Sequence, residues 1–120
     1  MAAHGTVARL TDMLEAIELI GEEMGGVTLP DFESDRRKRW LVERGLEIVS
    51  EASRRLPAAL KARHASIPWE KVAAIGNVLR HDYERIAYDV IWRVVQDDLR
   101  PLETVCRLEL AAATGEDASS

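Results

Sequence analysis

The sequence predicts an all-α protein, folded as an antiparallel bundle of four to five helices. Helix-forming Ala, Leu, Glu and Arg dominate its 120 residues. Strand-favouring residues form no alternating runs, and only six residues are aromatic. A hydrophobic fraction of 47% is sufficient for one core. We therefore expect one helical domain over residues 1–113 and a disordered polar tail over residues 114–120.

The first helix is predicted from about Thr6 to Met24, because apolar residues recur there at steps of three and four. Gly25 and Gly26 should end it. The stretch VTLPDF then predicts a loop marked by Pro30. The apolar face of this helix comprises Leu10, Met13, Leu14, Ile17, Ile20 and Met24.

A second helix should begin near Ser34 or Asp35, either of which can cap it, and end at Leu56 before Pro57. Three carboxylates spaced by four residues are expected along one edge of this helix. They are Glu43, Glu47 and Glu51. The predicted apolar stripe contains Leu41, Ile48, Val49, Ala52 and Leu56.

Residues 57–67 predict a connector with one short helical turn in PAALKARH, and a third helix should span about residues 68–81. Its expected inward residues are Trp69, Val72, Gly76 and Leu79. A fourth helix should begin near Ile86 or Ala87. Its expected inward residues are Val90, Ile91, Val94, Val95 and Leu99. We expect Pro101 to kink or break this helix, with Asp98 as a possible cap for a continuation to about Ala112.

The charge and the cysteine count restrict the function classes. A net charge of −5 excludes nucleic-acid binding through the overall field, so an RNA contact would need a local basic cluster. Cys106 is the single cysteine, which rules out a disulfide framework and favours a small buried side chain. We find no pattern of a signal peptide or a membrane span and expect a cytoplasmic protein without a membrane partner.

The stretch GNVLRHDY contains the most informative polar residues. Asn77 and His81 are four apart and share one side of the third helix. A glycine inside a helix, as expected for Gly76, lowers the stability of the helix by roughly 1 kcal/mol relative to alanine. Its presence is explained either by close packing against another helix or by a functional cleft that has lost a side chain. His81 itself fits either a functional group or a packed helix end.

The order of these features resembles the HepT-like ribonuclease toxins, a branch of the HEPN superfamily of helical domains. The resemblance covers about residues 8–105. It is carried by the segments RLTDMLEAIELI, DFESDRRKRWLVERGLEIVSEASRRLP, IPWEKVAAIGNVLRHDY and VIWRVVQDDLRPLE. Family members typically carry Arg-x4-His-x-Tyr, often with Asn after the Arg. Asn77, His81 and Tyr83 match this motif, whereas Gly76 stands where the family has arginine.

The resemblance implies RNA cleavage without a metal or other cofactor. His81 would act as the base near the ribose 2′-hydroxyl, with Asn77 beside it. A guanidinium suits the phosphate that is attacked, and Arg80 is the substitute for the missing arginine. Arg80 also fits a solvated cation at the helix end. The alternative is a binding module of the same fold that cleaves nothing.

The resemblance also implies partners. Family toxins are restrained by a minimal nucleotidyltransferase antitoxin that attaches AMP to the tyrosine of the motif, here Tyr83. They are usually homodimers in which both motifs line one cleft. The basic run Arg36–Arg39 would contribute to RNA binding or be a solvated helix start. Glu51 would orient His81 or Arg80, or be a surface carboxylate.

Overall fold

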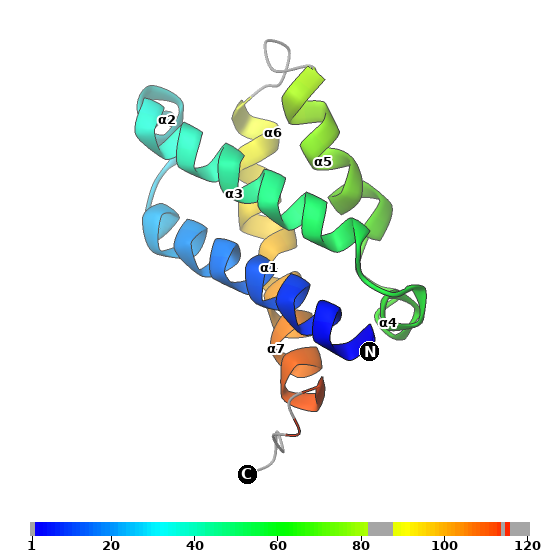
Figure 1. Ribbon diagram of the computed structural model, residues 1–120. Helices are drawn as coiled ribbons and strands as arrows, with labels where there is room; N and C mark the ends of the chain where they lie inside the picture. The colour runs from blue at the N-terminus through cyan, green and yellow to red at the C-terminus, as the bar shows by residue number, and fades with distance from the viewer. Residues whose placement is uncertain (1, 82–87, 114, 116–120) are drawn as a thin grey trace.

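The computed structural model describes residues 2–81, 88–113 and 115, and every regular element in these residues is helical. Figure 1 shows the chain reversing direction from α1 to α3, from α3 to α5, and again from α5 to the run that starts with α6. The all-α antiparallel bundle is thereby confirmed. The long helical units are α1 (Ala2–Met24), α3 (Arg36–Arg54), α5 (Trp69–His81) and the run of α6 (Tyr88–Arg93), η1 (Val94–Asp98) and α7 (Leu99–Ala113).

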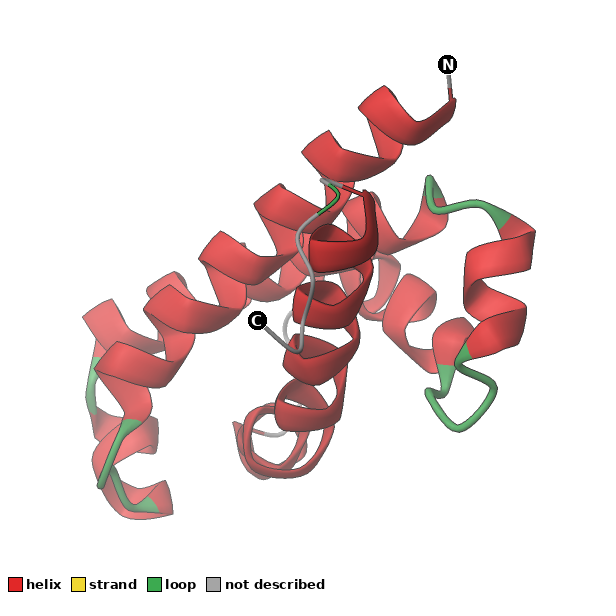
Figure 2. Cartoon of the chain, turned by 90° about the horizontal axis from the view of Figure 1, so that it is seen from below, coloured by secondary structure: helices red, strands yellow, loops and turns green. Residues whose placement is uncertain are grey.

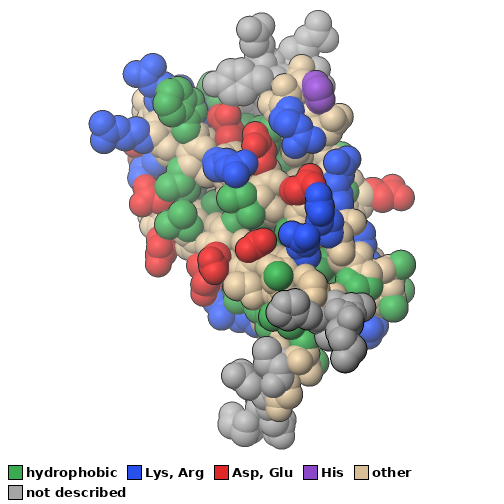
Figure 3. Space-filling model, in the orientation of Figure 1, with side chains coloured by type: hydrophobic (Ala, Val, Ile, Leu, Met, Phe, Trp, Pro, Cys, Tyr) green, Lys and Arg blue, Asp and Glu red, His purple; other side chains and the backbone are tan. Residues whose placement is uncertain are grey.

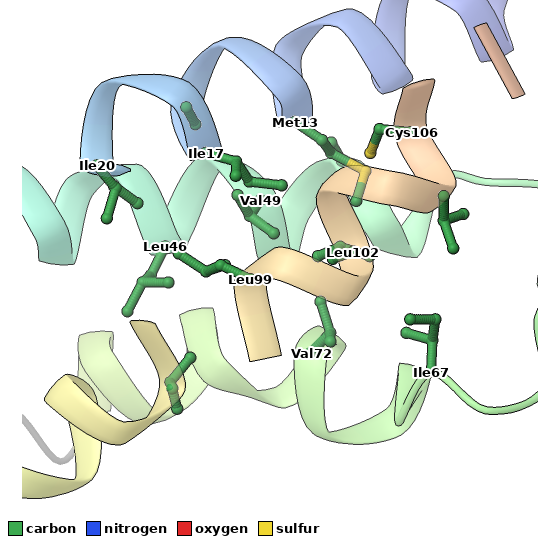
Figure 4. Packing of buried hydrophobic residues seen from close by; sticks show 14 of the residues in the cluster. Met13, Ile17, Ile20, Leu46, Val49, Ile67, Val72, Leu99, Leu102 and Cys106 are labelled. Atoms are coloured by element: carbon green, nitrogen blue, oxygen red, sulfur yellow. The ribbon is translucent and has the colours of Figure 1, made fainter. Parts of the chain in front are cut away.

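The core lies where α1, α3, α5 and α7 face one another (Figure 4). The predicted apolar face of α1 is confirmed, with Leu14 partly buried and the other five residues buried. Gly45 allows α1 and α3 to approach closely. A Cβ on Gly45 would lie 2.7 Å from Ile20 Cδ1. Figure 2 shows the same helical arrangement from below.

The segment predicted as a loop contains a short helix, α2 (Leu29–Ser34). Thr28 caps it, because its hydroxyl accepts a hydrogen bond from the Asp31 N–H at 3.3 Å. Pro30 lies in the first turn, where its missing N–H costs nothing. Phe32 is fully buried and meets Tyr88 edge to face, with ring centroids 6.2 Å apart. The loop prediction was wrong because Pro30 starts a helix at this position.

The ends of α3 and α5 match their sequence signals closely. Asp35 is the N-cap of α3, accepting from the Lys38 N–H at 3.1 Å, and α3 ends at Arg54, two residues before the predicted Leu56. The short helical turn predicted in the connector is α4 (Ala58–Arg63). Trp69 starts α5, and its indole N–H is shared by the carbonyls of Lys61 and His64 at 3.0 Å each. This shared bond ties α5 to α4.

The fourth unit departs from its prediction at three positions. Val90 is 53% exposed and does not point inward. Pro101 does not break the unit, because the backbone forms the π-helix η1 before α7 and Pro101 falls in the first turn of α7. Asp98 is not a cap but an ion-pair partner of Lys71, at 2.8 Å. The predicted starting point, at residues 86–87, lies outside the described residues.

The π-helix η1 keeps the two halves of this unit facing the same core. Val94 and Leu99 are both buried although they are five positions apart in the sequence. In a regular α-helix, five residues turn the chain by about 500°, which would direct these side chains about 140° apart. The wider π turn removes much of this difference. None of the helices in the described part of the chain has both the length and the apolar character of a membrane span.

Candidate active site

The C-terminal part of α5 carries the described polar residues of the GNVLRHDY stretch. Asn77, Arg80 and His81 are all exposed, and Arg80 and His81 are the basic residues of its last turn. Positive charge at a helix C-terminus is favoured by the partial negative charge of the unpaired carbonyls. This end of α5 therefore presents two basic side chains and one amide to solvent. Tyr83 lies outside the described residues.

Gly76 marks a close approach of α5 to α3. Its N–H donates to the Ser50 hydroxyl oxygen at 3.0 Å, and the same hydroxyl donates to the Ala73 carbonyl at 2.8 Å. A Cβ on Gly76 would lie 3.0 Å from Ser50 Oγ and 3.2 Å from Ser50 Cβ. These distances leave no ordinary room for a side chain. The interpretation of Gly76 as a position of close helix packing is confirmed.

Arg80 folds back along α5 toward Gly76. Its Nη1 atom lies 3.4 Å from the position that a Cβ of Gly76 would occupy. Arg80 is four residues after Gly76, so the two share one side of the helix. The guanidinium thus lies beside Gly76, the position at which the resemblance implies an arginine. His81 follows Arg80 directly, and adjacent side chains on a helix diverge by about 100°.

Glu51 makes a local ion pair with Arg55, one turn along α3. The Arg55 Nη2 to Glu51 Oε1 distance is 3.2 Å, and both side chains are about half exposed. Within the described residues no hydrogen bond or ion pair joins Glu51 to Arg80 or His81. In this structure Glu51 therefore has the contacts of a surface carboxylate.

The three carboxylates do not line one edge of α3, because the row winds from the core to solvent. Glu43 is buried, Glu47 is partly buried and Glu51 is exposed. A four-residue step on an α-helix turns about 40° beyond a full revolution, which explains the drift. Burial raises the pKa of the Glu43 carboxyl, Arg39 acts in the opposite direction, and Glu47 raises it further. The even spacing did not predict the burial of Glu43, which this drift explains.

The basic run at the start of α3 is divided among several contacts. The Arg36 guanidinium lies 5.6 Å from the centroid of the exposed Trp40 ring, and that of Arg39 lies 4.7 Å from the Tyr88 ring. Lys38 Nζ donates to the Glu23 carbonyl at 3.2 Å. Figure 3 shows Lys and Arg side chains interspersed with Asp and Glu over α3 and α5. The run is therefore no uniform basic field.

The remaining histidine with a described side chain belongs to a structural cluster. His64 Nε2 lies 2.7 Å from Glu109 Oε2, and Arg63 Nη2 donates to Glu109 Oε1 at 2.7 Å. These contacts fasten α4 to α7. The Arg63 guanidinium and the His64 ring hold the pKa of the Glu109 carboxyl below its ordinary value, against a smaller opposing effect of burial. Within the described residues, no three His, Cys, Asp or Glu side chains are placed to hold a metal ion.

Comparisons with known proteins place these features in a family. The model of the family described as "Ribonuclease HepT-like" matches residues 13–108. A protein named "Probable ribonuclease HepT" from Thermococcus cleftensis is 37% identical over 94 residues, which are 78% of this chain and 86% of that protein. A candidate RNase from Caldanaerobacter subterraneus subsp. tengcongensis is 30% identical over 94 residues, 78% of this chain and 84% of its own length. No solved structure matches the chain significantly. With most of its length matched by the family and by these relatives, this chain belongs to the HepT-like ribonucleases.

Proposed function

We propose that this protein is a metal-independent endoribonuclease and the toxin of a toxin–antitoxin pair. The observation that carries the proposal is the position of Arg80. Its guanidinium lies 3.4 Å from the Cβ position of Gly76, beside the point from which the family's arginine extends. A guanidinium keeps its charge and pairs with phosphate oxygens. Arg80 lies one turn further along α5. It thus supplies the positive charge that a glycine at position 76 cannot provide.

His81 is the proposed base, because an imidazole titrates near neutral pH. It takes the proton of a ribose 2′-hydroxyl, whose oxygen then attacks the neighbouring phosphorus. Arg80 stabilises the charge on the phosphate oxygens. Asn77, four residues before His81 on the same side of α5, is proposed to hydrogen-bond the imidazole or the RNA. All three side chains are exposed and open to a strand of RNA.

A binding module that cleaves nothing is the second candidate, and Gly76 itself favours it. The absence of an arginine at that position removes a charge that is worth roughly 10²–10³ in rate when it is preorganised. Such a module would keep the helical scaffold and bind the same antitoxin. The two candidates differ in RNA cleavage and agree in fold.

Expression of the chain alone in a bacterial host separates the two candidates. The ribonuclease arrests growth, and His81→Ala and Arg80→Ala each abolish the arrest, whereas Arg100→Ala, an exposed arginine on α7, does not. Purified protein should also cleave single-stranded RNA in the presence of EDTA. Normal growth and intact RNA with the wild-type protein would instead support the binding module.

The proposed partner is a minimal nucleotidyltransferase that transfers AMP to Tyr83. The added phosphate would place negative charge two residues from His81 and repel an RNA phosphate. Co-expression with the nucleotidyltransferase should restore growth and add the mass of AMP to the peptide containing Tyr83. Tyr83→Phe should remove the mass change. A restored growth rate without any modification of this peptide would contradict this route of neutralisation.

The active form is proposed to be a homodimer. Val78 on α5 and Val90 on α6 are 39% and 53% exposed. They line an apolar groove together with Ala74, Ile75 and Ile91. Burial of this groove against a second copy would bring two α5 helices, each with Arg80 and His81, to one interface. Two such helices offer a longer RNA-binding surface than one.

A further inference from the structure

Trp40 is a large aromatic side chain on the exposed side of α3 that neither the core nor the proposed chemistry uses. It is 58% exposed, the largest exposed fraction among the big hydrophobic side chains of the described residues. The other four lie on α1, α5, α6 and α7, so Trp40 is not part of an apolar patch with any of them on its own helix. The side chains around the ring therefore decide what it can bind.

Three of the four helical neighbours of Trp40 are arginines. Residues three and four positions away share one side of an α-helix, and here these residues are Arg36, Arg37, Glu43 and Arg44. The three arginines are exposed, whereas Glu43 is buried. The core of a protein–protein contact is depleted of charged residues. This ring is instead surrounded by positive charge, which is complementary to an anionic ligand.

The ring is held on one side and open on the other. The Arg36 guanidinium lies over the Trp40 ring, 5.6 Å from its centroid, as in a cation–π pair. Arg44 is restrained only by a 3.4 Å ion pair with Glu47, and 72% of its side chain is exposed, so its guanidinium can reach a phosphate. An aromatic face between two guanidinium groups fits an unpaired base and its flanking phosphates. Sites for single-stranded nucleic acid combine these two kinds of group.

Trp40 lies at the same end of the α3–α5 pair as the proposed catalytic residues. Ser50 marks the contact with α5 through its hydrogen bond to Gly76, and the two helices run in opposite directions (Figure 1). From this contact, Trp40 lies about 15 Å back along α3 and His81 about 8 Å forward along α5. The ten residues between Trp40 and Ser50 turn Trp40 by about 80° around α3, from the α5 side toward solvent. A strand with one phosphate at Arg80 can therefore extend along α3 to Trp40.

We infer that Trp40, Arg36 and Arg44 form an RNA-binding subsite in which the indole stacks on an unpaired base, a few nucleotides from the cleaved linkage. This inference rests on the proposed function, because RNA is the ligand in both. Stacking tolerates every base, since each has a π face, so the subsite does not select a sequence. A base within a duplex is already stacked and does not reach the ring. The subsite therefore selects single-stranded over double-stranded RNA.

The first test measures binding of the full chain to a fluorescent 2′-O-methyl RNA of about 12 nucleotides, which lacks the attacking hydroxyl and cannot be cut. Trp40→Ala should weaken binding by roughly 5–150-fold, the equivalent of one lost stacked base. Trp40→Phe should keep most of the affinity. Trp40→Leu, which has apolar area but no π face, should bind as weakly as Trp40→Ala and replaces it should the alanine variant not fold. Leu108→Ala is the control, because Leu108 is 51% exposed on α7, and it should bind like the wild type.

The salt dependence of binding separates the ring from the arginines. Arg44→Ala should reduce the slope of log affinity against log salt concentration by about 0.7, the value for one phosphate of a single strand. Trp40→Ala should weaken binding at every salt concentration and leave this slope unchanged. An RNA with an abasic nucleotide at the stacked position should bind the wild type as weakly as intact RNA binds Trp40→Ala. The same abasic RNA should cause Trp40→Ala no additional loss.

On an RNA that can be cut, Trp40→Ala should raise KM and leave kcat unchanged, because the contact is remote from the reacting phosphate. Cleavage by the wild type with no effect of Trp40→Ala on affinity or KM would overturn the inference and leave the ribonuclease standing. Trp40-dependent binding without cleavage would support the subsite and overturn the proposed reaction. Normal RNA binding by Trp40→Ala together with loss of the dimer or of the nucleotidyltransferase would identify a protein contact and overturn the inference. A wild-type protein that binds no RNA would overturn both.

Discussion

Ser50 and Gly76 are joined by a hydrogen bond that connects two helices through a side chain on one and the backbone of the other. The Ser50 hydroxyl accepts from the Gly76 N–H at 3.0 Å and donates to the Ala73 carbonyl at 2.8 Å. The hydroxyl therefore occupies the space that a side chain at residue 76 would need. A larger residue at 76 must displace Ser50 before it can reach solvent. The absence of an arginine at position 76 is thus linked to the close packing of α3 on α5, because Ser50 occupies the space of its side chain.

Gly76→Ala should destabilise the protein by roughly 1–3 kcal/mol, as expected for overpacking at a close contact. Urea unfolding measures the change. The matched control is Gly21→Ala, because Gly21 lies within α1 and a Cβ there meets nothing within 4 Å. This control should stabilise the helix by up to about 1 kcal/mol. In a Ser50→Ala background the cost of Gly76→Ala should shrink, and equal costs in both backgrounds would contradict the steric explanation.

Arg80→Ala should reduce RNA cleavage by roughly 10²–10³-fold, because a positioned charge near the phosphate is lost. Arg80→Lys should recover only part of the rate, since an ammonium lacks the planar pair of donors. Initial rates on a single-stranded RNA give both values. Full activity of Arg80→Ala would show that the phosphate is stabilised by another group.

Glu109→Gln should destabilise the protein near neutral pH, and this loss of stability should be smaller at acidic pH. The pKa of Glu109 is lowered in the folded protein by Arg63 and His64. A carboxyl with a depressed pKa stabilises the fold above its unfolded value of 4.5, and this stabilisation is lost as the pH falls through the folded pKa. The difference in thermal midpoint between wild type and variant should therefore shrink below about pH 4.5. A difference that is constant with pH would exclude this ion cluster as its source.

Cys106 should be inert in the native protein. Its side chain is fully buried, and burial raises the pKa of the thiol to about 12. The thiolate, which is the reactive form, is therefore scarce and inaccessible. A chromogenic disulfide reagent should label no thiol in buffer and one thiol per chain in urea. Rapid labelling of the folded protein would indicate an opening of the α1–α7 contact.

Val90→Glu should convert the proposed dimer to a monomer, because a charge would be buried in the groove between α5 and α6. Light scattering coupled to gel filtration measures the mass. Leu19→Glu is the control, since Leu19 is 51% exposed on α1, outside this groove. An unchanged mass for Val90→Glu, or a wild-type monomer, would require another arrangement of the active form.

The sequence predicted the elements whose signals are local. The apolar periodicity of α1, the Asp35 cap and the start of α5 after Pro68 depend on neighbouring residues, and all three are observed. The helix α2 was missed because Pro30 is compatible with both a loop and a first turn. The Thr28 cap and the burial of Phe32 decide between them.

The candidate site was less predictable because its arrangement depends on two helices. The motif indicated Asn77 and His81, and Arg80 was inferred as the substitute for the missing arginine, yet no pattern in α3 identifies Ser50 as the residue beside Gly76. Contacts between helices far apart in the sequence cannot be derived from periodicity alone.

The π-helix from Val94 to Asp98 also bears on how this chain tolerates changes in length. A π turn holds one residue more than the α turn that it replaces. Deletion of a single exposed residue here, such as Gln96, would leave a regular α-helix whose buried positions keep their phase. Insertions and deletions elsewhere in the long helices would rotate the buried positions that follow relative to the core. This turn is therefore the place where a shortened homologue would lose a residue and keep the same interior.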